Sequence, residues 1–157
     1  MNNIFQTHCL DTKCNLKYKH LSSIDNKLLS QINLVFITTF KANNPDIIII
    51  TKSDDVYAFG PNGNARQGFG TTSAVVEPTL VPELCDKGIK NILIRQQFGI
   101  GLTQSGDVYT WGYDYMGLLG LGQSNTYMKP TKLSVDTMSD TISKIDCTYS
   151  SIGFAFS

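Results

Sequence analysis

The sequence predicts an all-β chain folded as part of a β-propeller, with a short helix near its N-terminal end. Residues 51–79 recur at 103–131, an offset of 52 residues, and ten positions are identical. A repeat period near 50 is typical of propellers and related arrays. The repeated segments alternate small apolar and aromatic residues with a period of two, as β-strands do. All 13 glycines lie at or after Gly60, so only the repeated part is rich in turn geometry.

The N-terminal part, residues 1–32, is predicted to be a loosely ordered leader that ends in a short helix. The helix is expected within residues 21–29, where apolar residues fall on one helical face. Ser22 or Ser23 could cap it, because a serine hydroxyl accepts a hydrogen bond from the first turn. We expect this helix to pack on the outside of the first repeat unit.

Three repeat units are predicted in residues 33–157, with approximate bounds 33–88, 89–141 and 142–157, the last incomplete. The predicted strands are 33–37, 46–51 and 56–59 in the first unit, and 89–94, 99–103 and 107–111 in the second. A hairpin turn precedes the third strand of each unit. Asp54 occupies the turn position that Gly106 occupies in the second unit, and aspartate tolerates left-handed backbone better than most residues.

Several repeat positions are predicted to be structural, because their recurrence favours turn geometry and packing between units over ligand binding. These positions are Gly60, Gly68, Gly70, Pro78, Trp111, Gly112, Gly120, Gly122 and Pro130. About three units are fewer than the four blades of the smallest usual propeller. The sequence therefore predicts a partial ring, and we expect the natural chain to continue.

The segments Asp107–Gly112, Gly117–Gly122 and Lys129–Thr131 together resemble the repeat of the regulator of chromosome condensation family. The resemblance covers about residues 33–157 and implies a β-propeller of the seven-bladed type. The order of elements at the N-terminal end further resembles proteins that join this propeller to a BTB domain. The units depart from the family pattern where a Cys-Gly…His sequence is common, because residues 94–98 lack its glycine and histidine.

Residues that break the repeat are the natural candidates for partner contacts, since propeller faces present loops and loops carry recognition. The candidates are Arg66, Gln67, Arg95, Gln96, Gln97, Phe98, Tyr113 and Tyr115. Thirteen basic residues balance thirteen acidic ones, so no nucleic-acid partner is expected. No apolar run approaches the length of a membrane span, and no secretory signal leads the chain. We therefore expect a cytoplasmic or nuclear location, reduced cysteines and no membrane partner.

No catalytic, cofactor or metal site is predicted. Cys9, Cys14 and His20 have a spacing wider than the Cys-x2-Cys pairs of structural zinc sites, so incidental thiols in a leader are the favoured interpretation. No histidine follows His20, which excludes a Cys-His or Ser-His nucleophile within the repeats. The glycine-rich segment 63–70 contains no Gly-Lys-Ser/Thr and precedes no predicted helix, unlike a phosphate-binding loop.

These features predict a protein-interaction module rather than an enzyme. If the parent protein carries a BTB domain, the resemblance implies the client-binding propeller of an adaptor for a cullin-based ubiquitin ligase. The alternative implied by the family is a guanine nucleotide exchange factor for a Ran-like small GTPase. The thin basic content of the leader and the degenerate repeats count against exchange. A decayed or partial gene product without activity of its own is a third hypothesis.

Overall fold

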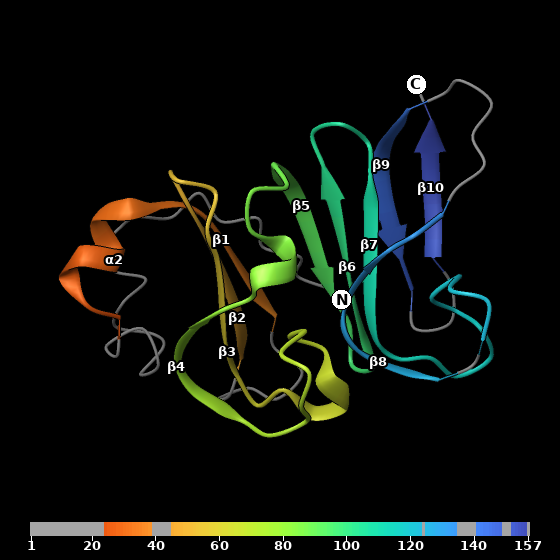
Figure 1. Cartoon of the computed structure of the whole chain (residues 1–157), viewed down its shortest axis with the longest axis horizontal. Helices are drawn as coiled ribbons and strands as arrows, with labels where there is room; N and C mark the ends of the chain where they lie inside the picture. Colours follow the sequence, from red (N-terminus) through yellow and green to blue (C-terminus); the bar gives the residue numbers. More distant parts are fainter. Residues whose placement is uncertain (1–23, 39–44, 124, 135–140, 149–151, 157) are drawn as a thin grey trace.

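The computed structural model describes residues 24–38, 45–123, 125–134, 141–148 and 152–156 as three antiparallel sheets preceded by one short helix (Figure 1). Helix α2 is Asn26–Gln31. The first sheet has the order β1–β2–β3–β4, formed by Ile32–Thr38, Asp46–Thr51, Val56–Gly60 and Val75–Leu80. The second has the order β5–β6–β7–β8, formed by Ile89–Ile94, Phe98–Thr103, Val108–Tyr113 and Thr126–Lys132. In the third, β9 (Ile142–Cys147) pairs with β10 (Ile152–Phe156).

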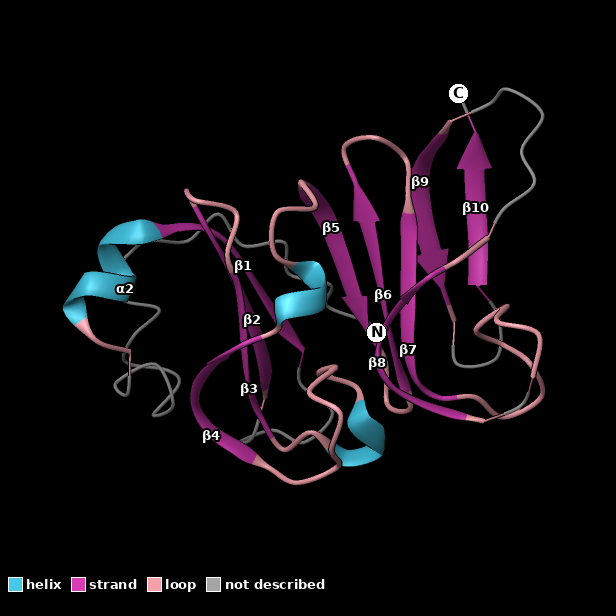
Figure 2. Cartoon of the chain, viewed as in Figure 1, coloured by secondary structure: helices cyan, strands magenta, loops and turns pink. Residues whose placement is uncertain are grey.

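The two four-stranded sheets follow one another in the chain and pack face to face, as propeller blades do, and we call them blades 1 and 2. We call the sheet of β9 and β10 blade 3. The first strands of the three blades are neighbours, because β5 contacts both β1 and β9. The all-β, partial-propeller fold predicted from the sequence is thus confirmed. The two short 3-10 turns, η2 (Gly63–Ala65) and η3 (Pro82–Leu84), lie in the connections around β4 (Figure 2).

The predicted strands are confirmed, but the fourth strand of each complete blade was not predicted. Strands β4 and β8 end the strand order of their sheets and contain Pro78 and Pro130. Proline lacks the N–H that an interior strand must donate, so it is confined to sheet edges. The two recurring prolines are therefore the sequence signal for an outer edge strand.

The helix starts later than predicted and is capped by a different residue. The carboxylate of Asp25 accepts a hydrogen bond from the backbone N–H of Leu28 at 2.6 Å, so Asp25 is the N-cap. The two serines predicted as caps lie outside the described residues. Leu28 and Leu29 pack against a cluster that contains the fully buried Ile47 and Ile49. The helix therefore covers the face of blade 1 that points away from blade 2.

The core consists of apolar layers between neighbouring blades. Between blades 1 and 2, Ile48 and Ala58 pack in one cluster with Ile92 and Trp111. A second cluster joins side chains of β6 and β7 to Ile142, Ile145 and Cys147 of β9. Both faces of β2 and β6 are buried along their whole length, which explains why their sequences show little alternation. Each blade is thus stabilised by its neighbours rather than alone.

A glycine of blade 1 fits against the outer strand of blade 2. Gly68 has φ +85°, and a Cβ there would lie 2.8 Å from Cδ of Pro130. Close by, the N–H of Gly70 donates to the carbonyl oxygen of Met128 at 2.8 Å. The repeated glycines therefore allow the loop after β3 to approach the next blade closely.

Replacing Gly68 by alanine is expected to destabilise the fold by about 1–3 kcal/mol more than replacing Gly122. The two glycines have nearly equal positive φ values, +85° and +86°, but a Cβ at Gly122 would meet nothing within 4 Å. The comparison therefore removes the cost of the backbone conformation and leaves that of the contact with Pro130. Urea unfolding of both variants measures the difference, and equal losses would contradict the close approach.

Candidate functional site

The candidate site is one end of the blades, formed by the loops that follow β3, β5 and β7. We call residues 61–73, 95–97 and 113–123 the loop face. These loops are joined by hydrogen bonds. Asn64 Nδ2 donates to the carbonyl oxygen of Gln96 at 3.1 Å, and the N–H of Tyr113 donates to the carbonyl oxygen of Gln97 at 2.7 Å. Contiguous loops from two blades thus form one surface.

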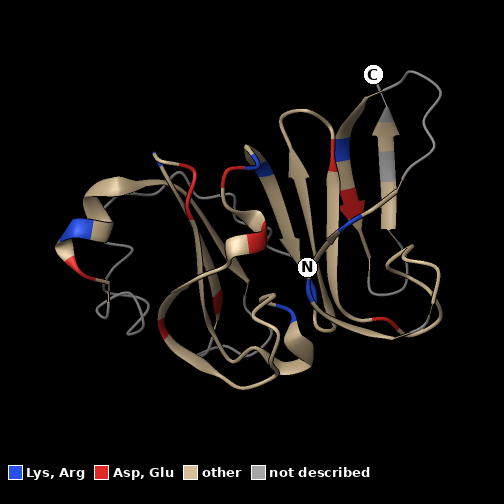
Figure 3. Cartoon of the chain, in the orientation of Figure 1, with Lys and Arg blue, Asp and Glu red and all other residues tan. Residues whose placement is uncertain are grey.

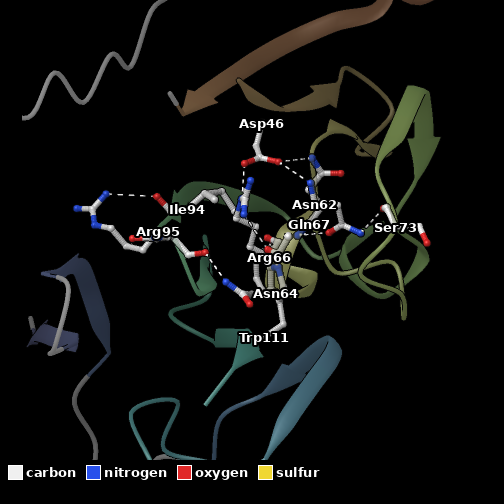
Figure 4. A network of polar contacts seen from close by, with 11 residues as sticks. Asp46, Asn62, Asn64, Arg66, Gln67, Ser73, Ile94, Arg95 and Trp111 are labelled. Atoms are coloured by element: carbon white, nitrogen blue, oxygen red, sulfur yellow. Dashed lines mark hydrogen bonds and ion pairs between the residues drawn. The ribbon is translucent and has the colours of Figure 1, made fainter. Parts of the chain in front are cut away.

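A buried polar network holds the first of these loops (Figure 4). Asp46, 1% exposed at the start of β2, accepts hydrogen bonds from Arg66 Nε and Gln67 Nε2. The same carboxylate accepts from the backbone N–H of Asn62 at 3.2 Å. Buried charges are tolerated only when they are paired and hydrogen-bonded, as this one is. The network therefore fixes residues 62–67 onto the strand behind them.

Asn62 closes the rest of this loop. Its side-chain amide donates to the carbonyl oxygens of Thr71 and Ser73 at 2.8 and 3.0 Å, while its Oδ1 accepts from the N–H of Gln67 at 3.1 Å. In blade 2, Asp114 Oδ1 accepts from the N–H of Leu119 at 3.2 Å, 52 residues further along the chain. Both blades thus use a buried Asx side chain to shape the same loop. The sequence analysis missed this pair because asparagine and aspartate do not score as identical.

The loops are also tied to the next blade. Trp111 Nε1, fully buried, donates to the carbonyl oxygen of Arg66 at 2.7 Å, from blade 2 to blade 1. Arg95 donates from Nε and Nη2 to the carbonyl oxygen of Cys147, at 3.2 and 2.7 Å, from blade 2 to blade 3. These contacts make the base of the loop face rigid.

The residues predicted to contact a partner divide into two groups. Arg66, Gln67 and Phe98 are buried, with 8%, 0% and 1% exposure, so the structure leaves their side chains inside the fold. Arg66 and Gln67 belong to the Asp46 network, and Phe98 packs in the core between blades 2 and 3. These three predicted contact residues are therefore wrong, because their side chains lie inside the fold and not on the loop face.

The other predicted contact residues lie on the surface. Gln96, Gln97, Tyr113 and Tyr115 are exposed, and Arg95 is half-buried over Cys147. The rings of Tyr113 and Tyr115 lie 6.5 Å apart, centroid to centroid, with an interplanar angle of 19°. The structure therefore brings the two tyrosines into one exposed aromatic pair.

Sequence reasoning missed Met116, which follows the tyrosine pair. Its side chain is 80% exposed and its φ is +75°, in the left-handed region. Non-glycine residues rarely adopt this conformation, and strain of this kind gathers at functional sites. The equivalent residue of blade 1 is Asn64, a type that tolerates the conformation, and its side chain donates to the carbonyl oxygen of Gln96. The unusual backbone of a methionine was not readable from the sequence.

The recurring positions serve the framework that carries these loops. Gly60 is the last residue of β3 and Gly112 the last but one of β7, with φ +133° and +108°. A Cβ at either would lie within 2.6 Å of a backbone carbonyl oxygen. Pro130 is buried against Gly68, while a Cβ at Gly120 would meet Leu133 at 2.9 Å. These contacts describe a structural rather than a ligand-binding use of the repeat.

The described residues of the loop face include three charged ones, Arg66, Arg95 and Asp114, and none of the three is fully exposed. Figure 3 shows how charged residues are distributed along the ribbon. Asp114 is 3% exposed and Arg66 8%, and Arg95 is half-buried. The remaining exposed groups are amides, hydroxyls, glycines, the two tyrosine rings and the side chain of Met116. The loop face therefore carries little charge.

Metal ligation finds no support in the described part of the chain, where no three His, Cys, Asp or Glu side chains lie together as a metal ion would need. The zinc candidates Cys9, Cys14 and His20 lie outside the described residues. Among the helices of the described ranges, none combines the length and apolar character that crossing a membrane requires.

Cys147 lies in the layer between blades 2 and 3, and burial raises the pKa of its thiol to about 11, against the opposing effect of Arg95. We expect the free energy of unfolding to fall as the pH rises from about 9 to about 11. In that window the unfolded chain has released the thiol proton and the folded chain still holds it, so a rising pH favours unfolding. Urea unfolding across this range should show a shallower decline in a Cys147→Ala variant. Equal slopes in both proteins would contradict the assignment.

The sheets are blades of a β-propeller, and the loops at one end of the first two blades lie together as one surface. Residues 105–151 match the family model of the Regulator of chromosome condensation (RCC1) repeat. They run from the turn before β7 through β9. This segment of the chain therefore matches the repeat of the regulator of chromosome condensation family, in agreement with the resemblance noted in the sequence.

Known relatives agree with this assignment. Over 99 residues the chain is 32% identical to Protein RCC1 of Candida albicans, covering 56% of this chain and 20% of that protein. Over 86 residues it is 30% identical to the human E3 ubiquitin-protein ligase HERC2, covering 55% of this chain and 2% of that protein. The structure of Prp20p from Saccharomyces cerevisiae superposes with a TM-score of 0.54 and 20% identity, covering 71% of this chain and 28% of that one. The chain thus spans less than a third of each of these proteins.

Proposed function

We propose that this chain forms part of a propeller that binds a protein partner through the loop face. The observation that carries the proposal is the exposed aromatic pair Tyr113 and Tyr115, together with Met116, on loops that are braced from within. Aromatic residues and methionine are enriched in protein interfaces, and a rigid base lowers the entropy lost on binding. No bond-making step is assigned to the chain, and no nucleic acid or membrane is proposed as its partner.

The finer form of the proposal is the client-binding part of an adaptor for a cullin-based ubiquitin ligase. Two observations support it: the N-terminal arrangement resembles BTB-linked relatives, and the chain is similar to HERC2, which is named as an E3 ubiquitin-protein ligase. In such an adaptor the propeller would choose the client and a BTB domain would bind the ligase. The loop face would then be the client-binding surface.

Guanine nucleotide exchange on a Ran-like small GTPase is the second candidate. It is favoured by the similarity to Protein RCC1 of Candida albicans and by the superposition on Prp20p, a protein reported with its binding properties to Gsp1p and histones. Exchange would need a propeller face that contacts the GTPase, and the loop face supplies exposed side chains for this. The two candidates thus use the same surface for different partners.

Two assays on the full-length protein separate the candidates. The first follows release of a fluorescent guanine nucleotide from a purified Ran-like GTPase. The second follows co-purification with a cullin subunit and transfer of ubiquitin to a co-purified protein. Release accelerated by the protein and reduced by Tyr115→Ala supports exchange. Ubiquitin transfer reduced by the same variant supports the adaptor, and activity in neither assay contradicts both candidates.

A further inference from the structure

Tyr113, Tyr115 and Met116 form an exposed aromatic and apolar patch, and this composition points to one class of protein ligand. We propose that the loop face around Tyr113 and Tyr115 binds an uncharged, proline-rich segment of a partner protein in an extended polyproline conformation. This inference rests on the proposed function and names the class of partner that the surface fits.

The two tyrosine rings of the patch have an arrangement that suits a proline-rich ligand. The two tyrosine rings are nearly parallel, at 19°, and their centroids lie 6.5 Å apart, so they present two similarly oriented aromatic surfaces. Tyr115 is 59% exposed and Tyr113 39%. Proline-rich segments dock onto aromatic-lined surfaces in other binding domains, where the pyrrolidine rings pack on the aromatic faces. The pair offers a surface of this type.

The backbone next to the patch is already hydrogen-bonded within the fold. Strand addition is not available there, because β7 lies between β6 and β8 and is paired on both sides. At the end of β7, the N–H of Tyr113 donates to the carbonyl oxygen of Gln97 at 2.7 Å. The N–H of the next residue, Asp114, donates to the carbonyl oxygen of Asn125 at 2.9 Å. The N–H groups of Tyr113 and Asp114 are therefore not free for a ligand, which favours recognition by the exposed side chains. A polyproline helix makes no internal hydrogen bonds and has few N–H groups that need an acceptor. It therefore leaves fewer backbone donors unsatisfied at such a site than another extended peptide would.

Hydrogen bonding and charge favour the same occupant. Gln97, whose carbonyl oxygen accepts from the N–H of Tyr113, and its chain neighbour Gln96 both have exposed side chains. Their amide groups can donate to peptide carbonyl groups, which point outward along a polyproline helix. The described residues of the loop face carry no fully exposed charge. An acidic, basic or phosphorylated segment would gain no ion pair there, so an uncharged segment is the matching occupant.

The test uses the full-length protein and a fluorescein-labelled decaproline peptide, with a labelled Gly-Ser decapeptide as control, followed by fluorescence anisotropy. We expect saturable binding of decaproline, at least tenfold weaker in Tyr115→Ala and retained in Tyr115→Phe. Changing the salt concentration from about 50 to about 500 mM should leave the affinity nearly unchanged, because screening acts only on charged contacts. The control variant is Val76→Ala, which removes a 74% exposed apolar side chain on β4 and should bind as the unmodified protein does.

A variant of Met116 separates binding from stability. Met116→Asn should unfold at the same or a higher temperature, since asparagine tolerates the left-handed conformation, and should bind decaproline more weakly. The proposal is overturned if decaproline fails to bind saturably, if Tyr115→Ala binds it unchanged, or if a labelled decathymidine binds in its place. Should decaproline fail while Tyr115→Ala still lowers nucleotide release or ubiquitin transfer, this inference fails and the proposed function stands.

Discussion

Replacing Trp111 by alanine is expected to lower the free energy of unfolding by about 3–5 kcal/mol. The side chain is fully buried and packs among residues of both blade 1 and blade 2. It also lies so close to Gly99 that a Cβ at Gly99 would meet the indole ring at 2.3 Å. The cavity left by alanine would therefore lie in the layer that joins the two blades. Urea unfolding of the purified protein measures the loss.

Two further variants show where the loss comes from. Trp111→Phe keeps most of the apolar volume but leaves the buried carbonyl oxygen of Arg66 without its donor, which costs about 1–3 kcal/mol. Tyr113→Ala, two residues away and exposed, should change the stability by less than about 0.5 kcal/mol. If Trp111→Ala costs no more than Tyr113→Ala, the layer between the blades does not carry the stability described here.

Replacing Asp46 by alanine is expected to cost about 3–5 kcal/mol, because it removes the carboxylate that forms a buried ion pair with the guanidinium of Arg66. The substitution also removes the acceptor for Gln67 Nε2 and for the N–H of Asn62. We expect the loop at residues 62–73 to lose its order first, and with it the contact to Trp111. Stability is measured by urea unfolding, and order of the loop by the rate of proteolytic cleavage within residues 61–73.

The control for Asp46 is an ion pair at the surface. Asp107 lies 2.9 Å from Lys132, but both side chains are exposed, at 41% and 56%, so Asp107→Ala should cost less than about 1 kcal/mol. The double variant Asp46→Ala with Arg66→Ala should cost less than the sum of the two single variants, since removing both partners leaves no unpaired buried charge. Additive losses would mean that the two side chains do not act together.

The sequence repeat was sufficient to predict the blades, because each unit contains the strand pattern and the turn residues that a blade needs. The period-two pattern at residues 56–59 and 108–111 places strands, and the glycines at 60 and 112 end them where only a positive φ fits. Asp54, expected to tolerate left-handed backbone, does adopt φ +63°. Each of these features depends on residues a few positions apart, and so the sequence was sufficient to place them.

The exposure of the loop residues was decided by tertiary structure alone. Arg66 and Gln67 read as surface contacts, since they break the repeat and lie in a loop between glycines. They are buried because Asp46, twenty residues earlier in the chain, places a carboxylate beneath them, and because Trp111 of the next blade covers the backbone of Arg66. Tyr115 and Met116 lie in the equivalent loop of blade 2 and are exposed. Burial of a polar side chain depends on a partner brought in from a distant part of the chain, and a local pattern does not contain that partner.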